Sequence, residues 1–200
     1  IWRRRVMRIV RRAKASKIMD IATGTGDLAI AMAKRVDRTQ ILGIDLSEEM
    51  LQVARKKIEK QGLDERITLE ECNVESIPLA DESVDAATVA FGVRNFEHQK
   101  EALIELKRTI KPEGHLIVLE FSNPKCALVR WVYKLYSHHI LPAIGRAISR
   151  NNSAYQYLPD SIDKFATPES YMALLREVGF SKVSRRSQSL GIAQIYIAQK

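Results

Sequence analysis

A glycine-rich segment followed by a spaced carboxylate is the part of this sequence best suited to chemistry. Asp20 and the run Gly24-Thr25-Gly26 follow a short apolar segment, and Asp45 ends the next apolar segment, 19 residues after Gly26. Glycines at such a position let the backbone turn tightly into a helix and approach a ligand closely. An acid at the second position can reach the ribose hydroxyls of a bound nucleotide. The spacing therefore predicts a site for a nucleoside-containing ligand.

Three features favour S-adenosylmethionine over a nicotinamide dinucleotide as that ligand. Asp20 would repel a pyrophosphate, but it would not repel a cationic sulfonium or an α-ammonium group. Asn73 and Val74 follow the third predicted strand, where an amide side chain and backbone groups can meet an adenine edge. Seven predicted strands that end in an antiparallel pair also differ from the six-stranded dinucleotide pattern. One alternative stays open, in which Asp20 and Asp45 only cap helices or pair with surface bases.

The elements that must position these residues alternate between strand and helix. Near-continuous apolar runs predict strands over residues 17–22, 40–45, 67–71, 84–91 and 115–121. Helices are predicted between them over residues 27–36, 48–61 and 99–110. Strands that are apolar on both faces indicate a parallel sheet with helices on both sides. The predicted fold class is therefore α/β, with a Rossmann-like, mostly parallel sheet.

The C-terminal part completes the predicted sheet. Thr167 followed by Pro168 marks the start of a helix that ends at Gly179. Residues 182–187 and 193–199 then predict two strands joined by a turn, which form a hairpin-like pair. Seven strands are expected in total.

The net charge of the chain comes from its first residues. Residues 1–17 hold eight basic side chains and no acid, and because the whole chain carries +8, residues 18–200 are neutral. Apolar side chains fall close to helical spacing among these charges, namely Trp2, Val6, Ile9, Val10 and Ala13. We expect an amphipathic basic leader helix that packs on the domain by its apolar stripe. Contact of this helix with anionic lipid or nucleic acid is the alternative.

Composition excludes several classes of protein. An apolar fraction of 46% and a charged fraction of 28% are those of a globular domain, not of a disordered or coiled-coil chain. The sequence contains no run of 18 apolar residues, so no membrane-spanning helix is predicted. Cys72 and Cys126 lie far apart, which argues against a disulfide scaffold or a zinc site and fits a reducing cytoplasm. The chain begins with Ile1 instead of Met, and we expect residues before it.

Several stretches of the sequence resemble a known family of enzymes. Residues 20–29 and 43–47 resemble the class I S-adenosylmethionine-dependent methyltransferases in general. Residues 91–96 and 108–122 resemble, more narrowly, the quinone C-methyltransferases of the menaquinone and ubiquinone pathways. Further stretches are similar to the substrate-side insert and the ending of those enzymes, over residues 148–162 and 191–196.

This resemblance implies S-adenosylmethionine as methyl donor, S-adenosylhomocysteine as product and a lipid quinol, demethylmenaquinol, as acceptor. The alternatives are an enzyme that also methylates a ubiquinone precursor, or another small-molecule methyltransferase. Carried over residue by residue, Thr25 binds the cofactor in the glycine loop, Asp45 binds the ribose, and Asn73 and Val74 lie on the adenine side. Ala90 stands where some relatives carry a serine that contacts the cofactor, so only its backbone is available here.

The resemblance also implies how the chain is organised. It predicts a single methyltransferase domain over residues 1–200, N-terminally truncated, with the basic leader at 1–17 and a helical substrate-side insert at 123–166. In the family, a segment that ends at the position of Trp2 helps to close the cofactor site. Only Trp2 of that segment is present in this sequence. We expect a cytoplasmic enzyme that works peripherally at the inner face of the membrane, without a nucleic-acid partner. A homodimer stays open.

Methylation of a hydroquinone carbon requires an electron-rich ring, which the loss of a phenolic proton supplies. Arg94 is predicted to stabilise the developing oxyanion, because strand carboxyl ends line the ligand crevice in such sheets. The alternative is that Arg94 pairs with a nearby acid and holds a loop. The proton acceptor stays open among water and several side chains: His138, His139, Tyr155 and Asp160.

No metal is needed for this chemistry, and none is predicted, because adjacent helical residues such as His138 and His139 point about 100° apart. The aromatic residues Trp131, Tyr133 and Tyr136 either cradle an isoprenoid tail or belong to a core helix. Two rival enzyme classes lack their signatures in the sequence: the Tyr-x-x-x-Lys pair of an oxidoreductase and the base-flipping motif of a nucleic-acid methyltransferase. A protein that binds the cofactor without catalysis is the third rival.

Overall fold

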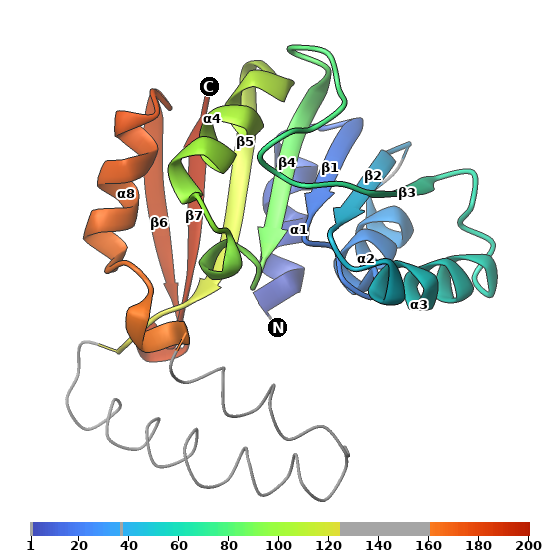
Figure 1. Ribbon diagram of the computed structural model, residues 1–200, viewed down its shortest axis with the longest axis horizontal. Coiled ribbons are helices and arrows are strands. Elements are labelled where there is room, and N and C mark those ends of the chain that lie inside the picture. The colour runs from blue at the N-terminus through green and yellow to red at the C-terminus, as the bar shows by residue number, and fades with distance from the viewer. Residues whose placement is uncertain (1, 37, 125–160) are drawn as a thin grey trace, which may run out of the picture.

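The computed structural model of the protein describes residues 2–36, 38–124 and 161–200. Its strands are β1 (Lys17–Ile21), β2 (Gln40–Asp45), β3 (Ile67–Glu71), β4 (Val84–Ala90), β5 (Ile110–Phe121), β6 (Lys182–Gln188) and β7 (Ala193–Gln199). They form one sheet in the order β3-β2-β1-β4-β5-β7-β6 (Figure 1). The first five pair in parallel, whereas β7 runs antiparallel to both β5 and β6. The predicted fold class and its antiparallel final pair are confirmed.

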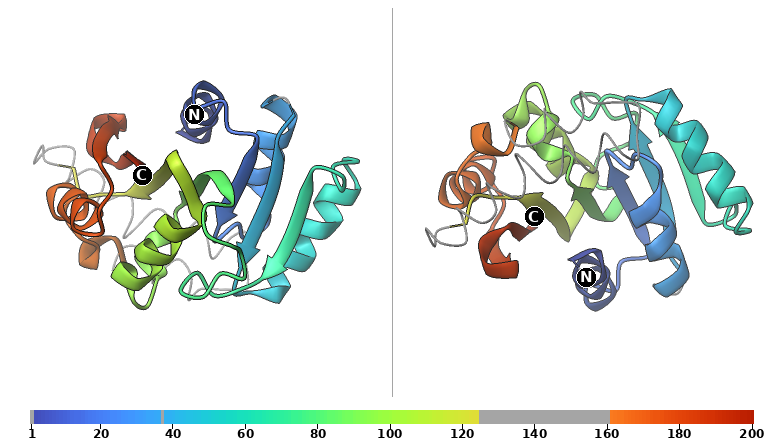
Figure 2. Two further views of the ribbon diagram at one scale, coloured as in Figure 1. Left: turned by 90° about the horizontal axis from the view of Figure 1, so that it is seen from above. Right: turned by 90° about the horizontal axis from the view of Figure 1, so that it is seen from below.

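Helices cover both faces of this sheet. They are α1 (Trp2–Arg12), α2 (Asp27–Arg35), α3 (Glu48–Glu59), α4 (Gln99–Thr109) and α8 (Pro168–Glu177). Figure 2 shows α1 and α4 on opposite faces. Successive residues of β1 serve two different cores, since Ile18 packs with buried residues of α1 and α2 while Met19 packs with those of α4 and α8. This two-sided burial explains why the central strands read as continuous apolar runs.

Two helices begin at residues whose side chains cap them. The hydroxyl of Ser47 accepts a hydrogen bond from the backbone N–H of Met50 at 3.3 Å, at the start of α3. The hydroxyl of Thr167 accepts one from the N–H of Ser170 at 3.2 Å, at the start of α8. Both bonds satisfy donors that the first turn of a helix leaves without an intrahelical partner.

The strand β5 begins five residues earlier than predicted. Ile110 already pairs with Val84, and the register then shifts before His115 pairs with Ala86. Within this irregular stretch Glu113 has a φ of +62°, and Gly114 approaches its surroundings so closely that a Cβ atom there would lie 2.8 Å from the carbonyl oxygen of Asp85. The stretch between the predicted helix (residues 99–110) and the predicted strand (residues 115–121) therefore forms a bulge inside the strand.

The leader forms α1, which packs against the domain by its apolar stripe. Val6, Met7, Ile9 and Val10 are buried in the core on that face of the sheet. The Trp2 ring lies against two aromatic side chains that follow β4 and end β5, with centroid distances of 6.1 Å to Phe91 and 5.9 Å to Phe121. The leader therefore packs on the domain by its apolar stripe, as expected.

Most of the predicted insert at 123–166 lies outside the described residues. The same is true of the side chains proposed for it: Trp131, Tyr133, Tyr136, His138, His139, Tyr155 and Asp160. Within the parts of the chain that the structure describes, no helix is both long and apolar enough to cross a bilayer.

Candidate active site

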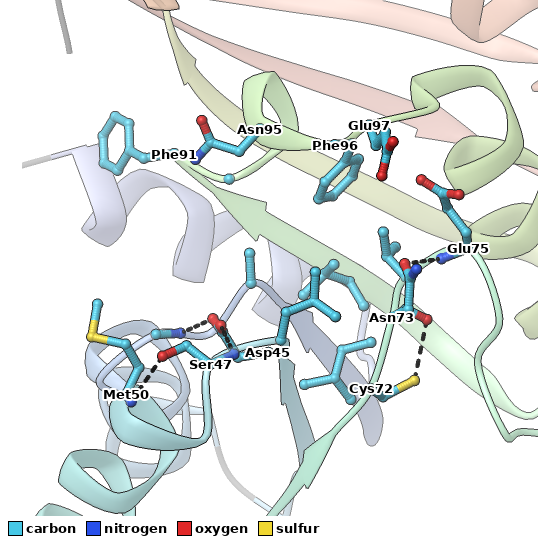
Figure 3. Close-up of a pocket in the computed structure, with 17 residues that line it drawn as sticks. Asp45, Ser47, Met50, Cys72, Asn73, Glu75, Phe91, Asn95, Phe96 and Glu97 are labelled. Carbon is cyan, nitrogen blue, oxygen red and sulfur yellow. Dashed lines mark hydrogen bonds between the residues drawn. The ribbon is translucent and has the colours of Figure 1, made fainter. Parts of the chain in front are cut away.

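A cavity of about 600 Å³ opens at the carboxyl ends of β1, β2, β3 and β4, where the loops after these strands converge (Figure 3). The strand order reverses between β1 and β4, and ligands in open α/β sheets bind at such a switch point. The volume falls within the range of roughly 300–1,000 Å³ that is usual for small-molecule sites. The sheet topology thus brings the predicted site residues to a ligand-sized space.

The glycine loop forms the floor of this cavity. Gly24 and Gly26 have φ values of +56° and +74°, and Gly26 directly precedes α2. A Cβ at Gly24 would meet only the Met50 side chain, at 3.9 Å, so the backbone there is open to a ligand. A Cβ at Gly26 would instead lie 3.1 Å from that of Ala54, so this glycine allows α2 and α3 to pack closely.

Asp45 connects the glycine loop to the start of α3. One of its carboxylate oxygens accepts from the backbone N–H of Gly24 at 2.8 Å, and the other accepts from the N–H of Ser47 at 3.0 Å (Figure 3). A carboxylate oxygen can accept two hydrogen bonds, so each retains capacity for a hydroxyl donor. The carboxylate therefore fits the predicted contact with a ribose while it also fixes the loop.

Asn73 and Val74 lie across the cavity from the glycine loop. The Asn73 side-chain oxygen accepts from the N–H of Glu75 at 3.0 Å, which fixes the orientation of the amide (Figure 3). Val74 is buried, and with Ile44 and Leu46 it gives the cavity an apolar wall. An apolar wall beside an oriented amide suits the flat face and polar edge of a base.

Asp20 lies in a smaller adjoining cavity of about 190 Å³, which Gly24, Thr25 and Ala90 also line. Its side chain is buried and accepts from the hydroxyls of Thr23 at 2.8 Å and Thr88 at 2.5 Å. Burial raises the pKa of Asp20 to about 6, although the two hydroxyls oppose the shift. A cation in this cavity would stabilise the ionised carboxylate, as a sulfonium or ammonium group would.

The hydroxyl of Thr25 is occupied by a lysine that the sequence does not point to. The Lys57 ammonium group donates to the Thr25 hydroxyl at 2.8 Å and to its carbonyl at 3.2 Å. It also pairs with Asp27, the first residue of α2, at 2.9 Å. Lys57 therefore holds the glycine loop to α3, a contact between residues 32 apart in the chain.

Arg94 lies behind the loop that closes the far side of the cavity, in the 3₁₀ turn η1 (Val93–Asn95). Its guanidinium group forms an ion pair of 2.6 Å with Glu120, whose side chain is fully buried, and donates to the Phe91 carbonyl at 2.7 Å. Its Nε lies 3.2 Å from the Ser161 hydroxyl. Burial raises the pKa of Glu120, and Arg94 opposes that shift. Arg94 therefore pairs with a nearby acid, Glu120, which is the alternative that the sequence leaves open.

Over its whole length, residues 1–200, the sequence matches the ubiE/COQ5 methyltransferase family. The chain belongs to this family. It is 39% identical over 199 residues to the demethylmenaquinone methyltransferase of Bacteroides fragilis, in an alignment that covers 100% of this chain and 81% of the relative. It is 42% identical over 195 residues to the ubiquinone/menaquinone biosynthesis C-methyltransferase UbiE of Syntrophotalea carbinolica, covering 98% and 81% of the two chains.

The fold of this methyltransferase is shared with solved structures. A crystal structure of a SAM-dependent methyltransferase from Aquifex aeolicus superimposes with a TM-score of 0.69 and 19% sequence identity, covering 96% of this chain and 87% of that one. Membership of the family makes the protein an S-adenosylmethionine-dependent methyltransferase, as the resemblance predicts, and the solved structure shows that the fold is shared.

The residues present fit this cofactor. The larger cavity offers Asp45, Asn73 and an apolar wall for a nucleoside, and the smaller one offers the buried Asp20 for a cationic group. Gly24 lines both cavities, which makes them two parts of one site. At the other wall, a Cβ on Gly92 would lie 2.5 Å from that of Ala22, so the loop after β4 rests directly on the glycine loop.

The structure divides the predicted site residues into two groups. Most of them line the two cavities, namely Asp20, Gly24, Thr25, Asp45, Asn73, Val74 and Ala90. Gly26 and Arg94 support those walls from outside the cavity surface. The sequence alone does not identify Lys57 or Glu120, because each acts through a contact with a residue distant in the chain.

Proposed function

We propose that this methyltransferase converts demethylmenaquinol to menaquinol. One observation carries the proposal: the segment that resembles quinone C-methyltransferases lines the same cavity as the cofactor-type residues, through Phe91, Gly92, Asn95 and Phe96. A quinol ring held by this segment would lie next to the methyl donor. The names of the relatives, which include demethylmenaquinone methyltransferase, support the same substrate.

When bound, S-adenosylmethionine would supply an electrophilic methyl group. A quinol ring that has lost a phenolic proton would take this methyl group on its carbon and release S-adenosylhomocysteine. The hydrogen on that carbon would then leave as a proton to restore the aromatic ring, and the phenolate oxygen would regain a proton to give the quinol product. The chain has three tasks in this reaction: to align the partners, to stabilise the phenolate and to exclude water. We assign the ribose hydroxyls to Asp45 and the adenine edge to Asn73 and Val74. Asp20 would receive the cationic end of the donor, next to the backbone of Ala90 and the Gly24-Thr25-Gly26 loop.

We propose that Arg94 stabilises the phenolate oxygen. The loop that it holds forms the wall next to the proposed ring position, and its side chain is nine-tenths buried, where a charge acts strongly. Its Nη1 and Nε atoms are engaged by Phe91, Glu120 and Ser161, which fixes the orientation of the guanidinium plane. In this proposal Glu120 is a positioning residue, since it acts through Arg94.

Methylation of a ubiquinone precursor in addition to demethylmenaquinol is the second candidate function. It is favoured by the relatives whose names include both quinones, at up to 42% identity. Activity on both acceptors, measured side by side with the purified protein, would establish the broader function, whereas activity on demethylmenaquinol alone would establish the narrower one.

The first experiment is a calorimetric titration with S-adenosylmethionine, S-adenosylhomocysteine and NADH in parallel. We expect the two sulfur nucleotides to bind and NADH not to bind. A methyl-transfer assay on chemically reduced demethylmenaquinone follows, with the oxidised quinone as control, because only the reduced ring has a phenolic proton to lose. Methylation of neither form, by protein that binds the cofactor, would refute the substrate assignment.

We also propose that the protein works in the cytoplasm at the inner face of the membrane, because its acceptor is a lipid.

A further inference from the structure

The outer face of α1 consists of arginines. Val6, Met7, Ile9 and Val10 turn inward, and the residues on the opposite side are exposed: Arg4, Arg5, Arg8, Arg11 and Arg12. This helix stands on one face of the sheet, where Figure 2 shows its outer side uncovered by the other described elements. Its apolar stripe is fully used by the core, so any partner of the outer face must be recognised by charge.

Four of the protein's arginines surround one hollow. Arg4, Arg8 and Arg11 of α1 and Arg35 of α2 line a surface cavity of about 360 Å³, together with Met7. Within the part of the chain that the structure describes, none of these four side chains forms an ion pair or a side-chain hydrogen bond. Like charges this close repel one another, and an anion placed among them would relieve that repulsion.

An exposed leucine lies at the end of the sheet next to α1. Leu190, in the turn η3 (Ser189–Gly191), is 79% exposed, and both it and Ser189 have left-handed φ values, +59° and +46°. Two hydrogen bonds hold this turn and the residue before it to the first turn of α1. The Trp2 indole N–H donates to the Ser189 hydroxyl at 2.9 Å, and the Arg5 guanidinium group donates to the side-chain oxygen of Gln188, the last residue of β6. The chain thus holds a large apolar side chain in water, in a strained backbone, beside a basic helix.

We propose that the outer face of α1 and Leu190 dock the protein on an anionic phospholipid bilayer. Lipid phosphates would bind among Arg4, Arg8, Arg11 and Arg35, and Leu190 would enter the interfacial region of the bilayer. A polybasic surface next to an exposed apolar side chain is suited to a bilayer. A nucleic acid would use the charges but would leave Leu190 in water, and residues 18–200 offer it no net positive charge.

Docking on a bilayer would bring the enzyme to a lipid substrate, and in this respect the inference rests on the proposed function. Arg3, one residue before the docking surface, already lines the smaller cavity with Asp20. Because a helix rises 1.5 Å per residue, the arginines from Arg4 to Arg11 extend over roughly 10 Å from that point. A quinol in the docked bilayer would therefore be close to the cofactor.

Flotation with vesicles tests the charge component. The whole protein is mixed with vesicles of phosphatidylcholine alone or of phosphatidylcholine with phosphatidylglycerol, at low and high salt. We expect binding only to the anionic vesicles, reduced by salt. The variant Arg4→Gln/Arg8→Gln/Arg11→Gln should bind about 100-fold more weakly, since each basic residue near an anionic surface contributes about fivefold. The matched control Lys56→Gln/Lys60→Gln/Arg176→Gln removes three exposed charges, from the last turn of α3, the residue after it and α8, and should bind nearly as the wild type does.

Leu190→Asn tests the apolar component without loss of the fold, because asparagine tolerates a left-handed φ better than leucine does. It should unfold no more easily than wild type in urea but should bind anionic vesicles more weakly, most clearly at high salt. Ile104→Asn, on the opposite face of the sheet, is the control and should leave binding unchanged.

Vesicle binding is measured without cofactor or quinol, so it is independent of the proposed reaction. Equal loss in the triple variant and its control would overturn the docking surface, as would equal binding to neutral vesicles. Binding of duplex DNA in place of anionic vesicles would also overturn it. If the docking is correct, the triple variant should methylate a short-chain, water-soluble quinol as wild type does and fail only on quinol in vesicles. A wild type that docks but methylates neither quinol would refute the proposed function alone.

Discussion

Lys57 is the side chain that joins the glycine loop to α3, and its removal tests whether that loop must be held for the cofactor to bind. Lys57→Met keeps most of the stem but loses the bonds to Thr25 and Asp27. We expect the dissociation constant for S-adenosylmethionine to rise roughly fivefold, about 1 kcal/mol, because the ammonium group is partly exposed. Calorimetry measures this change, and kcat at saturating cofactor should stay near the wild-type value. Lys56→Met, one residue away and exposed, is the control.

The ion pair of Arg94 and Glu120 allows two roles of the arginine to be separated. Arg94→Met leaves a buried carboxylate without its cation, at a cost of about 3–5 kcal/mol that protonation of Glu120 lessens. The double variant Arg94→Met/Glu120→Gln removes that charge and should recover much of the stability in urea. If Arg94 acts on the quinol, both variants lose at least about 100-fold in kcat. Wild-type turnover in the double variant would leave Arg94 only the task of holding the loop.

Asp20 makes cofactor binding and stability depend on pH in opposite directions. Burial raises its pKa from 3.8 to about 6, so the folded protein holds this proton more tightly than the unfolded chain. The contribution of Asp20 to the free energy of unfolding is therefore full below about pH 4. It is lost as the pH rises through about 6, by up to about 3 kcal/mol. A cationic cofactor prefers the ionised form, so its affinity should increase over the interval from about pH 5 to 7.

Calorimetry of the wild type and of Asp20→Asn across this pH range checks the prediction. The variant should bind S-adenosylmethionine weakly and with little pH dependence. Its urea midpoint should also lack the decrease that the titration of Asp20 gives the wild type as the pH rises through about 6. A wild-type affinity that does not change between pH 5 and 7 would contradict the assignment of the cationic group to Asp20.

At the scale of elements, the bulge in β5 places Gly114 where its surroundings leave no space for a side chain. In Gly114→Ala the new Cβ would lie 2.6 Å from the Ile110 side chain and 2.8 Å from two backbone carbonyl oxygens. We expect a loss of more than about 2 kcal/mol in the free energy of unfolding, measured in urea. Gly62→Ala, after α3, is the matched control because it has a φ of +62° with nothing within 4 Å. It should lose only the cost of the left-handed conformation, about 1 kcal/mol.

The elements themselves could be predicted because each is determined locally. Alternate residues of the central strands face two apolar cores, so each of these strands is a continuous apolar run in the sequence. Ser47 and Thr167 cap helices with their own side chains. The bulge could not be predicted, since the same Pro112 and Gly114 also suit a turn. Its presence depends on the pairing of Ile110 with Val84 in another strand.

At the scale of the whole molecule, the sequence predicts which residues line the two cavities but not what holds them there. Motif positions such as Asp45 and Asn73 meet at one edge because the parallel topology requires it. Lys57 lies in no motif, and Glu120 lies in a stretch that resembles the family but does not by itself indicate a partner, since any long cation or buried carboxylate at a suitable place in the fold could serve. Supporting contacts of this kind depend on three-dimensional packing, which a local pattern does not encode.

The position of α1 also determines the order in which the chain can mature on the ribosome. This helix is made early, yet its apolar stripe packs on β5 and its Trp2 bonds to Ser189, 187 residues later. At roughly 5–20 residues per second, the stripe waits about 10–40 s for its last partner to be synthesised. During that interval the nascent chain presents an amphipathic, arginine-rich helix to its surroundings, so a chaperone or a membrane surface can engage it before the fold exists.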